Sequence, residues 1–178
     1  MSETAVAAAV AASRDMRIDF ERLYESSRDD VFAYAAGLLR DRAAAEDATA
    51  AAFERAYRKR SRFDPAKGSP RAWLFGIARN AALDELRRRG RHAELSAEPV
   101  DVASVGVTVE DERSELRLVL AAALNQLEGR ERELIALKFF AGLSNREIAH
   151  VLGTSESNAG TKLHRTVNKL RETCDGAL

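Results

Sequence analysis

Cysteine, histidine and proline are scarce in this 178-residue chain. Its one cysteine, Cys174, excludes an intrachain disulfide. The three histidines, His92, His150 and His164, lie far apart and have no cysteine at ligand spacing, so we expect no metal site and no cofactor. We find no nucleophile paired with a base and no phosphate-binding glycine loop. The sequence therefore argues against an enzyme.

Long apolar runs are also missing. No stretch approaches the roughly 18 apolar residues that a membrane-spanning helix needs, so we expect no membrane insertion. The alanine-rich stretch at residues 5–12 lacks an early lysine or arginine and a strongly apolar centre, which is unlike a signal peptide. We interpret residues 1–15 as an N-terminal tail. Together with the lone cysteine, these features predict a cytoplasmic protein.

Residues with branched β-carbons are few, while alanine, leucine, arginine and glutamate dominate, which favours helix throughout. Apolar residues at helical spacing predict helices near residues 19–40, 43–62, 70–89, 112–127, 130–141, 144–152 and 155–170. We expect a break in the first helix near Ser26 and Ser27. Gly90 suits the end of the third helix.

Residues 92–111 contain Pro99 and Gly106 and show no sustained periodicity, so they predict a flexible linker. The predicted fold is all-α, with two small helical domains at residues 16–91 and 112–178. Fully stretched, the linker spans about 65–70 Å, which allows the two domains to occupy well-separated sites on a shared partner.

Charge is unevenly distributed although the net charge is zero. Residues 55–91 hold 12 basic and three acidic side chains, whereas residues 1–54 and 92–128 are each acidic on balance. A concentrated basic block is typical of a surface that binds a polyanion such as DNA. A solvated basic helix face is the alternative explanation.

The last fifty residues predict a helix-turn-helix. Ser144 and Glu147 have the spacing of a capping box, Gly153 permits a sharp turn, and Ser155 can cap the next helix. One face of that second helix carries Thr161, Lys162, His164, Arg165 and Lys169. A basic second helix suits a recognition helix in a major groove, although a helical hairpin with a solvated charged face is also compatible.

Two sets of motifs resemble one known family, the extracytoplasmic-function (ECF) type of bacterial sigma-70 factor. Residues 20–91 resemble region two through Ala45-Glu46-Asp47, Phe53-Glu54-Arg55-Ala56-Tyr57, Arg62-Phe63-Asp64 and the stretch from Gly68-Ser69-Pro70 to Ala78-Arg79-Asn80. Residues 115–172 resemble region four through Gly142-Leu143-Ser144, Glu147-Ile148-Ala149, Leu152-Gly153 and Leu163-His164-Arg165.

The resemblance implies that the protein gives core RNA polymerase its promoter choice, with the first domain opening the −10 element and the second reading the −35 element as duplex. Opening DNA requires aromatic surfaces for unstacked bases and cations for the backbone. The implied −10 residues are Phe63, Lys67, Ser69, Arg71, Trp73, Arg79 and Asn80. Of these, Trp73 is expected to serve mainly the core, and Asp84 is expected to pair with a nearby arginine.

The implied −35 residues are Ser155, Asn158, Thr161, Lys162, His164 and Arg165. Contacts with the clamp and flap of the large polymerase subunits are also implied, with the docking residues Leu39, Glu46, Asp47, Ala50 and Ala51. Ala50 and Ala51 stand where the family usually has a glutamine and an acid, which predicts a weakened dock. Gly160 replaces a basic residue that relatives commonly use on DNA.

Two alternatives remain open at this stage. A stand-alone helix-turn-helix regulator accounts for residues 129–172 but leaves the basic block unused. A sigma-like protein held mainly by an anti-sigma partner fits the acidic and apolar surfaces, and many members of the family have such a partner.

Overall fold

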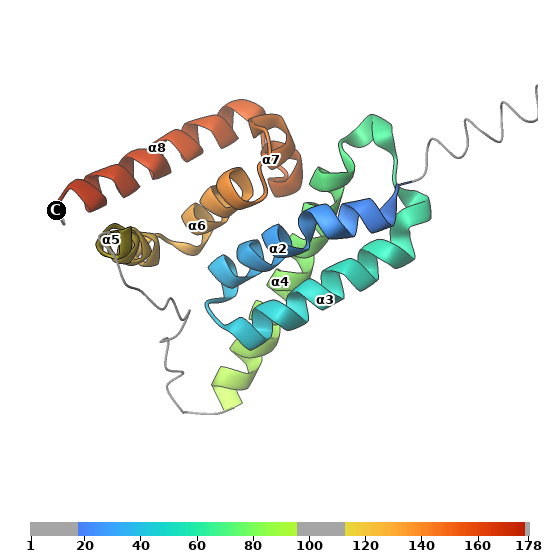
Figure 1. The fold of residues 1–178 in the computed structure, drawn as a ribbon, viewed down its shortest axis with the longest axis horizontal. Coiled ribbons are helices and arrows are strands. Elements are labelled where there is room, and N and C mark those ends of the chain that lie inside the picture. Colours follow the sequence, from blue (N-terminus) through green and yellow to red (C-terminus); the bar gives the residue numbers. More distant parts are fainter. Residues whose placement is uncertain (1–17, 96–112, 177–178) are drawn as a thin grey trace, which may run out of the picture.

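The computed structural model describes residues 18–95 and 113–176, and all regular structure within these ranges is helical (Figure 1). The helices are α2 (Phe20–Leu39), α3 (Arg42–Lys59), η1 (Arg60–Arg62), η2 (Pro65–Lys67), α4 (Pro70–Leu95), α5 (Arg113–Gln126), α6 (Gly129–Ile135), η3 (Ala136–Phe140), α7 (Asn145–Leu152) and α8 (Glu156–Asp175). The all-α prediction is confirmed. None of the helices in the described ranges is long and apolar enough to cross a membrane.

The first helix is continuous, so the predicted break at Ser26 and Ser27 is wrong. Ser26 satisfies its hydroxyl within the helix by donating to the carbonyl oxygen of Leu23 at 3.3 Å. Ser27 is 1% exposed and faces the core. Serine tends to interrupt a helix by bonding to the backbone in other conformations, and here its bonds are compatible with helical geometry.

Helix α4 continues through Gly90 to Leu95, so the predicted stop at Gly90 is also wrong. Gly90 is not among the residues with a positive φ, and the left-handed conformation is what makes glycine a helix end. Glu85 pairs with Arg88 and Arg89 one turn later, which supports this part of the helix. The first residues of the predicted linker are therefore helical, whereas residues 96–112 and the tail at 1–15 lie outside the described residues.

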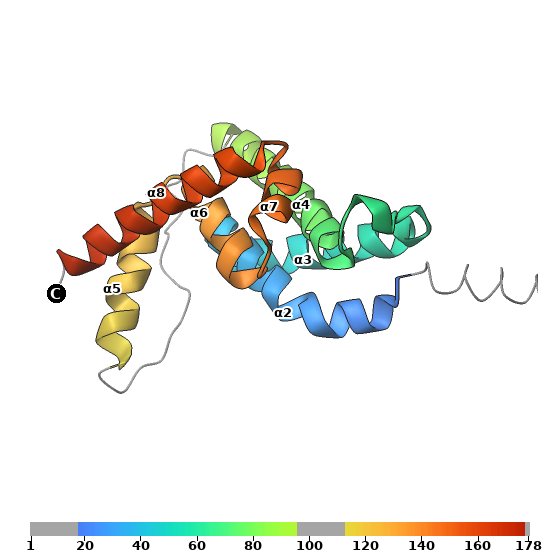
Figure 2. The same ribbon diagram turned by 90° about the horizontal axis from the view of Figure 1, so that it is seen from above.

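The C-terminal half contains the predicted helix-turn-helix, formed by α7 and α8 (Figures 1 and 2). Before it, η3 is a π-helical turn in which the amide of Ala141 donates to the carbonyl of Ala136 at 3.0 Å. A π turn inserts one residue and re-aims its neighbours. Phe139 and Phe140 are left 63% and 40% exposed.

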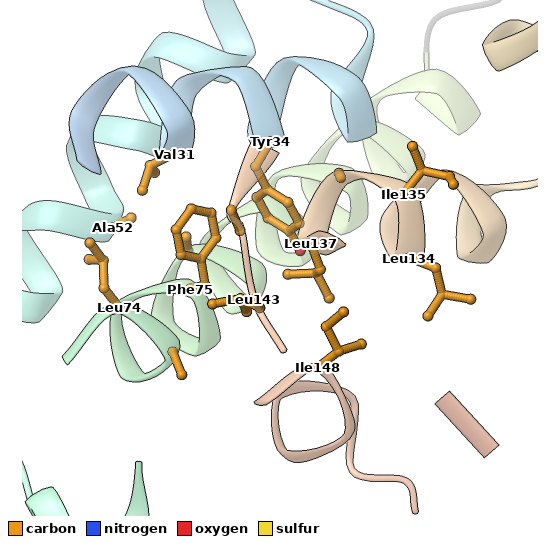
Figure 3. Packing of buried hydrophobic residues seen from close by; sticks show 14 of the residues in the cluster. Val31, Tyr34, Ala52, Leu74, Phe75, Leu134, Ile135, Leu137, Leu143 and Ile148 are labelled. Carbon is orange, nitrogen blue, oxygen red and sulfur yellow. The ribbon is translucent and has the colours of Figure 1, made fainter. Parts of the chain in front are cut away.

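The two halves share one hydrophobic core (Figure 3). The rings of Tyr34 and Phe75 meet edge to face, with centroids 5.6 Å apart, and Leu137, Leu143 and Ile148 pack beside them from the other half. All five residues are at most 1% exposed. In this structure the two predicted domains are thus packed together and not held apart, because α2 and α4 bury one face against α6, η3 and α7.

Candidate nucleic-acid interface

The recognition helix α8 begins with a local network of polar side chains. Ser155 caps the helix by accepting from the amide of Asn158 at 3.2 Å, and the Asn158 side chain donates to the Thr154 hydroxyl at 2.6 Å. These bonds fix the first turn of α8 directly after Gly153, whose φ of 65° supplies the sharp bend. Two of the six predicted −35 residues therefore define the start of the helix.

The other four −35 candidates share the outer face of α8. Ala159 and Leu163 are buried beneath that face. The exposed side chains are Thr161, Lys162, His164 and Arg165. This face combines two cations with hydroxyl and imidazole groups, which suits contacts with phosphates and base edges.

The first helix of the motif, α7, begins with the predicted capping box, which the structure confirms. The Ser144 amide donates to Glu147 at 2.9 Å, and the Glu147 amide donates to the Ser144 hydroxyl at 3.2 Å. Burial acts to raise the pKa of Glu147, but hydrogen bonds from Ser69 and Ser144 outweigh it and hold the pKa below its ordinary value. Glu147 is consequently ionised whenever the helix-turn-helix is in this geometry at neutral pH.

The −10 candidates of the loop lie next to the start of α4. Phe63 and Trp73 meet edge to face with centroids 5.7 Å apart, and both are half-buried, in agreement with the expectation that Trp73 packs on the core. Asp64 accepts from the amide of Ala66 at 3.0 Å and shapes the loop, while Lys67 is exposed. Both aromatic side chains therefore remain partly exposed to solvent.

Arg71 lies at the junction of the two halves. Its guanidinium pairs with Asp30 at 2.6 Å and donates to the hydroxyl of Ser27 at 3.3 Å, both on α2. It also donates to the backbone carbonyls of Phe140, the last residue of η3, and of Ala141, which follows it. Most of the donors of Arg71 are therefore already used.

Arg79 forms the second cross-contact. Its Nε donates to Glu133 at 2.6 Å, and the Tyr34 hydroxyl donates to the same carboxylate oxygen at 3.2 Å. Glu133 is 7% exposed, so its charge needs these partners. Burial, reinforced by the charge of Glu133, raises the pKa of Tyr34 well above its usual value.

Ser69 makes the third cross-contact by donating to Glu147 at 2.5 Å, while its hydroxyl also accepts from the amide of Ala72 and so caps α4. We call this interface the seam. It comprises Ser69, Arg71, Arg79 and Tyr34 on the N-terminal side and Glu133, Ala141 and Glu147 on the C-terminal side. Asn80 remains exposed beside it, in a small hollow shared with Trp73 and His150.

The predicted polymerase-docking residues lie along the end of α2 and on α3. Glu46, Asp47 and Ala50 are exposed, and Ala51 is half-buried. Leu39 is only 5% exposed and packs in a small alanine-rich cluster between α2, α3 and α4. Its side chain therefore supports this surface from below and does not form it.

Asp84 pairs with Arg55 at 2.7 Å and with Arg87 at 3.2 Å, which confirms its expected pairing with arginine. Sequence reasoning missed Glu133, the only acid among the described residues that bonds both an arginine and a tyrosine across the seam. Its signal was weak, because Glu133 stands between Arg132 and Leu134 in a run that mixes charges with apolar residues. Only its burial distinguishes it.

Two family models match the chain. Residues 23–92 match sigma-70 region 2, and residues 117–170 match sigma-70 region 4. The RNA polymerase sigma factor CarQ of Myxococcus xanthus is 36% identical over 155 residues, which cover 86% of this chain and 87% of CarQ. The ECF RNA polymerase sigma factor SigL of Mycobacterium tuberculosis is 32% identical over 153 residues, with 85% and 86% covered.

Two solved structures of similar shape also match the chain. The sigma factor RpoE of Bartonella quintana, in complex with the anti-sigma factor NepR, matches with a TM-score of 0.72 and 25% identity, over 88% of this chain and 97% of RpoE. CnrH, in complex with the cytosolic domain of CnrY, matches with a TM-score of 0.62 and 26% identity, over 88% of each chain. Sigma factors are transcription initiation factors, a class distinct from enzymes.

Proposed function

This chain belongs to the ECF sigma factors of the sigma-70 family, which direct core RNA polymerase to promoters, and we propose that its two domains divide promoter recognition between them. The N-terminal domain, residues 16–91, opens the −10 element. The C-terminal domain, residues 112–178, reads the −35 element as duplex. Since core polymerase is the partner of a sigma factor, the proposed place of action is the cytoplasm.

The observation that carries the proposal for the second domain is the exposed polar face of α8. The side chains of Lys162 and Arg165 form no hydrogen bond or ion pair with the other described residues, and the bend at Gly153 with the cap at Ser155 fixes the direction in which α8 begins. A rigidly held helix loses little entropy on entering a major groove. We propose Arg165 for a guanine or phosphate contact, and Lys162 for a phosphate contact.

The −10 function of the first domain is proposed to require separation of the two halves. Ser69, Arg71 and Arg79 are bonded across the seam, so DNA must compete with Glu133, Glu147 and backbone carbonyls for them. A phosphate offers the same acceptor chemistry as a carboxylate, so the exchange leaves no guanidinium unsatisfied.

We assign the contact with the polymerase clamp to α3 and the contact with the polymerase flap to the C-terminal domain. Glu46 and Asp47 supply exposed acids, while Ala50 and Ala51 provide none of the polar groups usual in relatives. Replacing Ala50 with glutamine is expected to tighten core binding in a pull-down. An Ala50→Gln chain that binds core no better would argue that this surface is not the dock.

Run-off transcription with purified core polymerase tests the proposal. The templates are forked, and their promoter sequences are first selected from a random library by this protein bound to core polymerase. We expect transcripts that depend on this protein, and their loss when Lys162 and Arg165 are both replaced by alanine. Binding to linear duplex without any transcription would favour a stand-alone helix-turn-helix regulator.

An anti-sigma partner is the remaining part of the proposal. The packed arrangement of the two halves favours it, because a protein that binds both halves at once would keep the seam closed. The structures matched above are themselves complexes with an anti-sigma factor or with the cytosolic domain of CnrY.

A further inference from the structure

A run of exposed residues joins the end of α3 to the loop of the −10 candidates. Tyr57, Lys59, Arg60 and Arg62 are all exposed, and no residue of η1 is buried. We call these four residues the η1 patch. They belong to the basic block of residues 55–91, but they are neither −10 candidates nor members of the seam. The patch therefore holds cations to which the proposed function assigns no role.

The arginine at the centre of the patch is held against an aromatic ring. The guanidinium carbon of Arg60 lies 3.8 Å from the ring centroid of Tyr57, which is a cation–π contact. Arg60 also donates to the carbonyl of Tyr57 at 2.6 Å. The Tyr57 ring in turn meets that of Phe20 on α2 edge to face, with centroids 5.2 Å apart. The planar guanidinium is thus fixed in position while Arg60 remains exposed to solvent.

The cations of the patch are not neutralised by acids of the described ranges. Arg58, which lies among them in sequence, pairs with Glu54 one turn earlier on α3. Lys59, Arg60 and Arg62 form no ion pair with any described acid. A polyanion that binds here breaks no existing ion pair of these three residues and displaces only counterions.

The patch is continuous with the aromatic pair of the −10 candidates. The amide of Phe63 donates to the carbonyl of Arg60 at 3.4 Å, so η1 ends where the loop begins. A 3-10 helix of three residues rises about 6 Å, which is close to two base steps of about 3.4 Å each. A strand with one base against Phe63 and Trp73 can therefore carry its next nucleotides over Arg60.

The patch also lies away from the seam. Figures 1 and 2 show the end of α3 at the opposite end of the molecule from α5. Ser69, Arg71 and Arg79 have to leave partners in the other half before they bind DNA, whereas the patch is exposed in the closed arrangement. Its cations are accessible without any separation of the halves.

We propose that the η1 patch binds the single strand of an opened promoter beyond the −10 element, on the side away from the −35 element. A base stacks on the guanidinium of Arg60, and phosphates contact Lys59 and Arg62. Arginine planes stack on unpaired bases, and such stacking is tolerant of sequence, so the patch lengthens the bound strand without adding a sequence preference. The bases of a duplex are paired and cannot reach Arg60 in this way. This inference rests on the proposed function, since the strand is led onto the patch from the −10 element.

Binding of forked DNA to the holoenzyme measures this contact. Each fork carries the selected promoter, and its single strand either ends with the −10 element or continues for about four nucleotides, a length that spans the patch. We expect Lys59→Gln/Arg60→Gln to weaken binding of the longer fork about tenfold more than binding of the shorter one. Core polymerase contacts each fork equally in both holoenzymes, so the difference reports the patch.

Two further variants separate net charge from stacking. Arg28→Gln/Arg130→Gln removes the same charge from exposed positions on α2 and α6, and is expected to affect both forks equally. Arg60→Lys keeps the charge but lacks the planar group. It should weaken binding of the longer fork while leaving its salt dependence unchanged. An Arg60→Lys chain that binds the longer fork as tightly as the unmodified chain would overturn the stacking role.

The same measurements distinguish this inference from the proposed function. A holoenzyme that fails to bind the shorter fork refutes the proposed −10 function, and this inference with it. Normal binding of the shorter fork, with both forks weakened equally by Lys59→Gln/Arg60→Gln, refutes the role of the patch alone. Weakened binding of core polymerase by that double variant in the absence of DNA would identify an acidic protein surface as the occupant, and would also overturn the proposal.

Discussion

The two surfaces assigned to DNA differ in what they bind in the folded chain. On α8, the side chains of Thr161, Lys162, His164 and Arg165 point into solvent. On α4 and the loop before it, Ser69, Arg71 and Arg79 are bonded to the other half of the molecule. One surface is available immediately, whereas the other depends on a conformational change. A basic residue at the expected position is therefore not necessarily a free one.

The largest expected effect on DNA binding concerns the exposed face of α8. Replacing Lys162 and Arg165 together with alanine is expected to weaken duplex binding about 100-fold, because each such interaction with DNA contributes about 1–3 kcal/mol. Binding measured at several salt concentrations should also show a shallower salt dependence, by about 0.9 for each phosphate that the variant no longer neutralises.

The double variant Arg22→Ala/Arg28→Ala removes the same charge from exposed positions on α2 and serves as its control. Equal weakening by both double variants would mean that net charge, and not the α8 face, governs binding.

The second prediction concerns a variant that weakens the seam. Glu133→Gln keeps the shape of the side chain but removes the charge that Arg79 and Tyr34 share, and is expected to destabilise the closed arrangement by about 1–3 kcal/mol. Single-stranded DNA should then bind the N-terminal domain more tightly, with duplex affinity unchanged. Fluorescence transfer between dyes on α3 and α8 reports the opening.

Glu131→Gln is the matched control, because Glu131 lies on the same helix but pairs with Lys169 inside the C-terminal half. If it opened the seam as much as Glu133→Gln does, the bond between Glu133 and Arg79 would not be what holds the halves together.

The third prediction concerns the pH dependence of the seam. Because the pKa of Glu147 is lowered in the folded chain, its contribution to stability is present above the ordinary value of 4.5 and is lost as pH falls through the folded value. We expect the same dye pair to report partial opening below about pH 4.5. In Glu147→Gln this acid-dependent component should disappear, and a profile identical to that of the unmodified chain would contradict the assignment.

The smallest expected effect lies within α8. A β-carbon at Gly160 would meet only the Asn145 side chain, at 3.4 Å, so Gly160→Ala should stabilise the chain by about 0.5–1 kcal/mol without altering the seam. Gly153→Ala should destabilise it, because residue 153 has a φ of 65°. Urea unfolding of both variants measures the difference, and a stabilised Gly153→Ala chain would contradict this account of the turn.

Local signals predicted the C-terminal half well. The cap at Ser144, the turn at Gly153 and the cap at Ser155 each depend on neighbours within a few residues, so the sequence contains all the information they need. The errors at Ser27 and Gly90 arose where tertiary and side-chain interactions decided against local preference: burial on α2 for the first, and arginine pairs with Glu85 for the second.

By itself, the sequence determined the helices, their caps, the helix-turn-helix and the family, since periodicity and short motifs encode all of them. Only the tertiary structure decided which of the cations are engaged across the seam and which remain exposed. The physical reason is distance along the chain: Arg79 and Glu133 are 54 residues apart. No local pattern specifies which buried charge will meet which partner once two helical faces pack together.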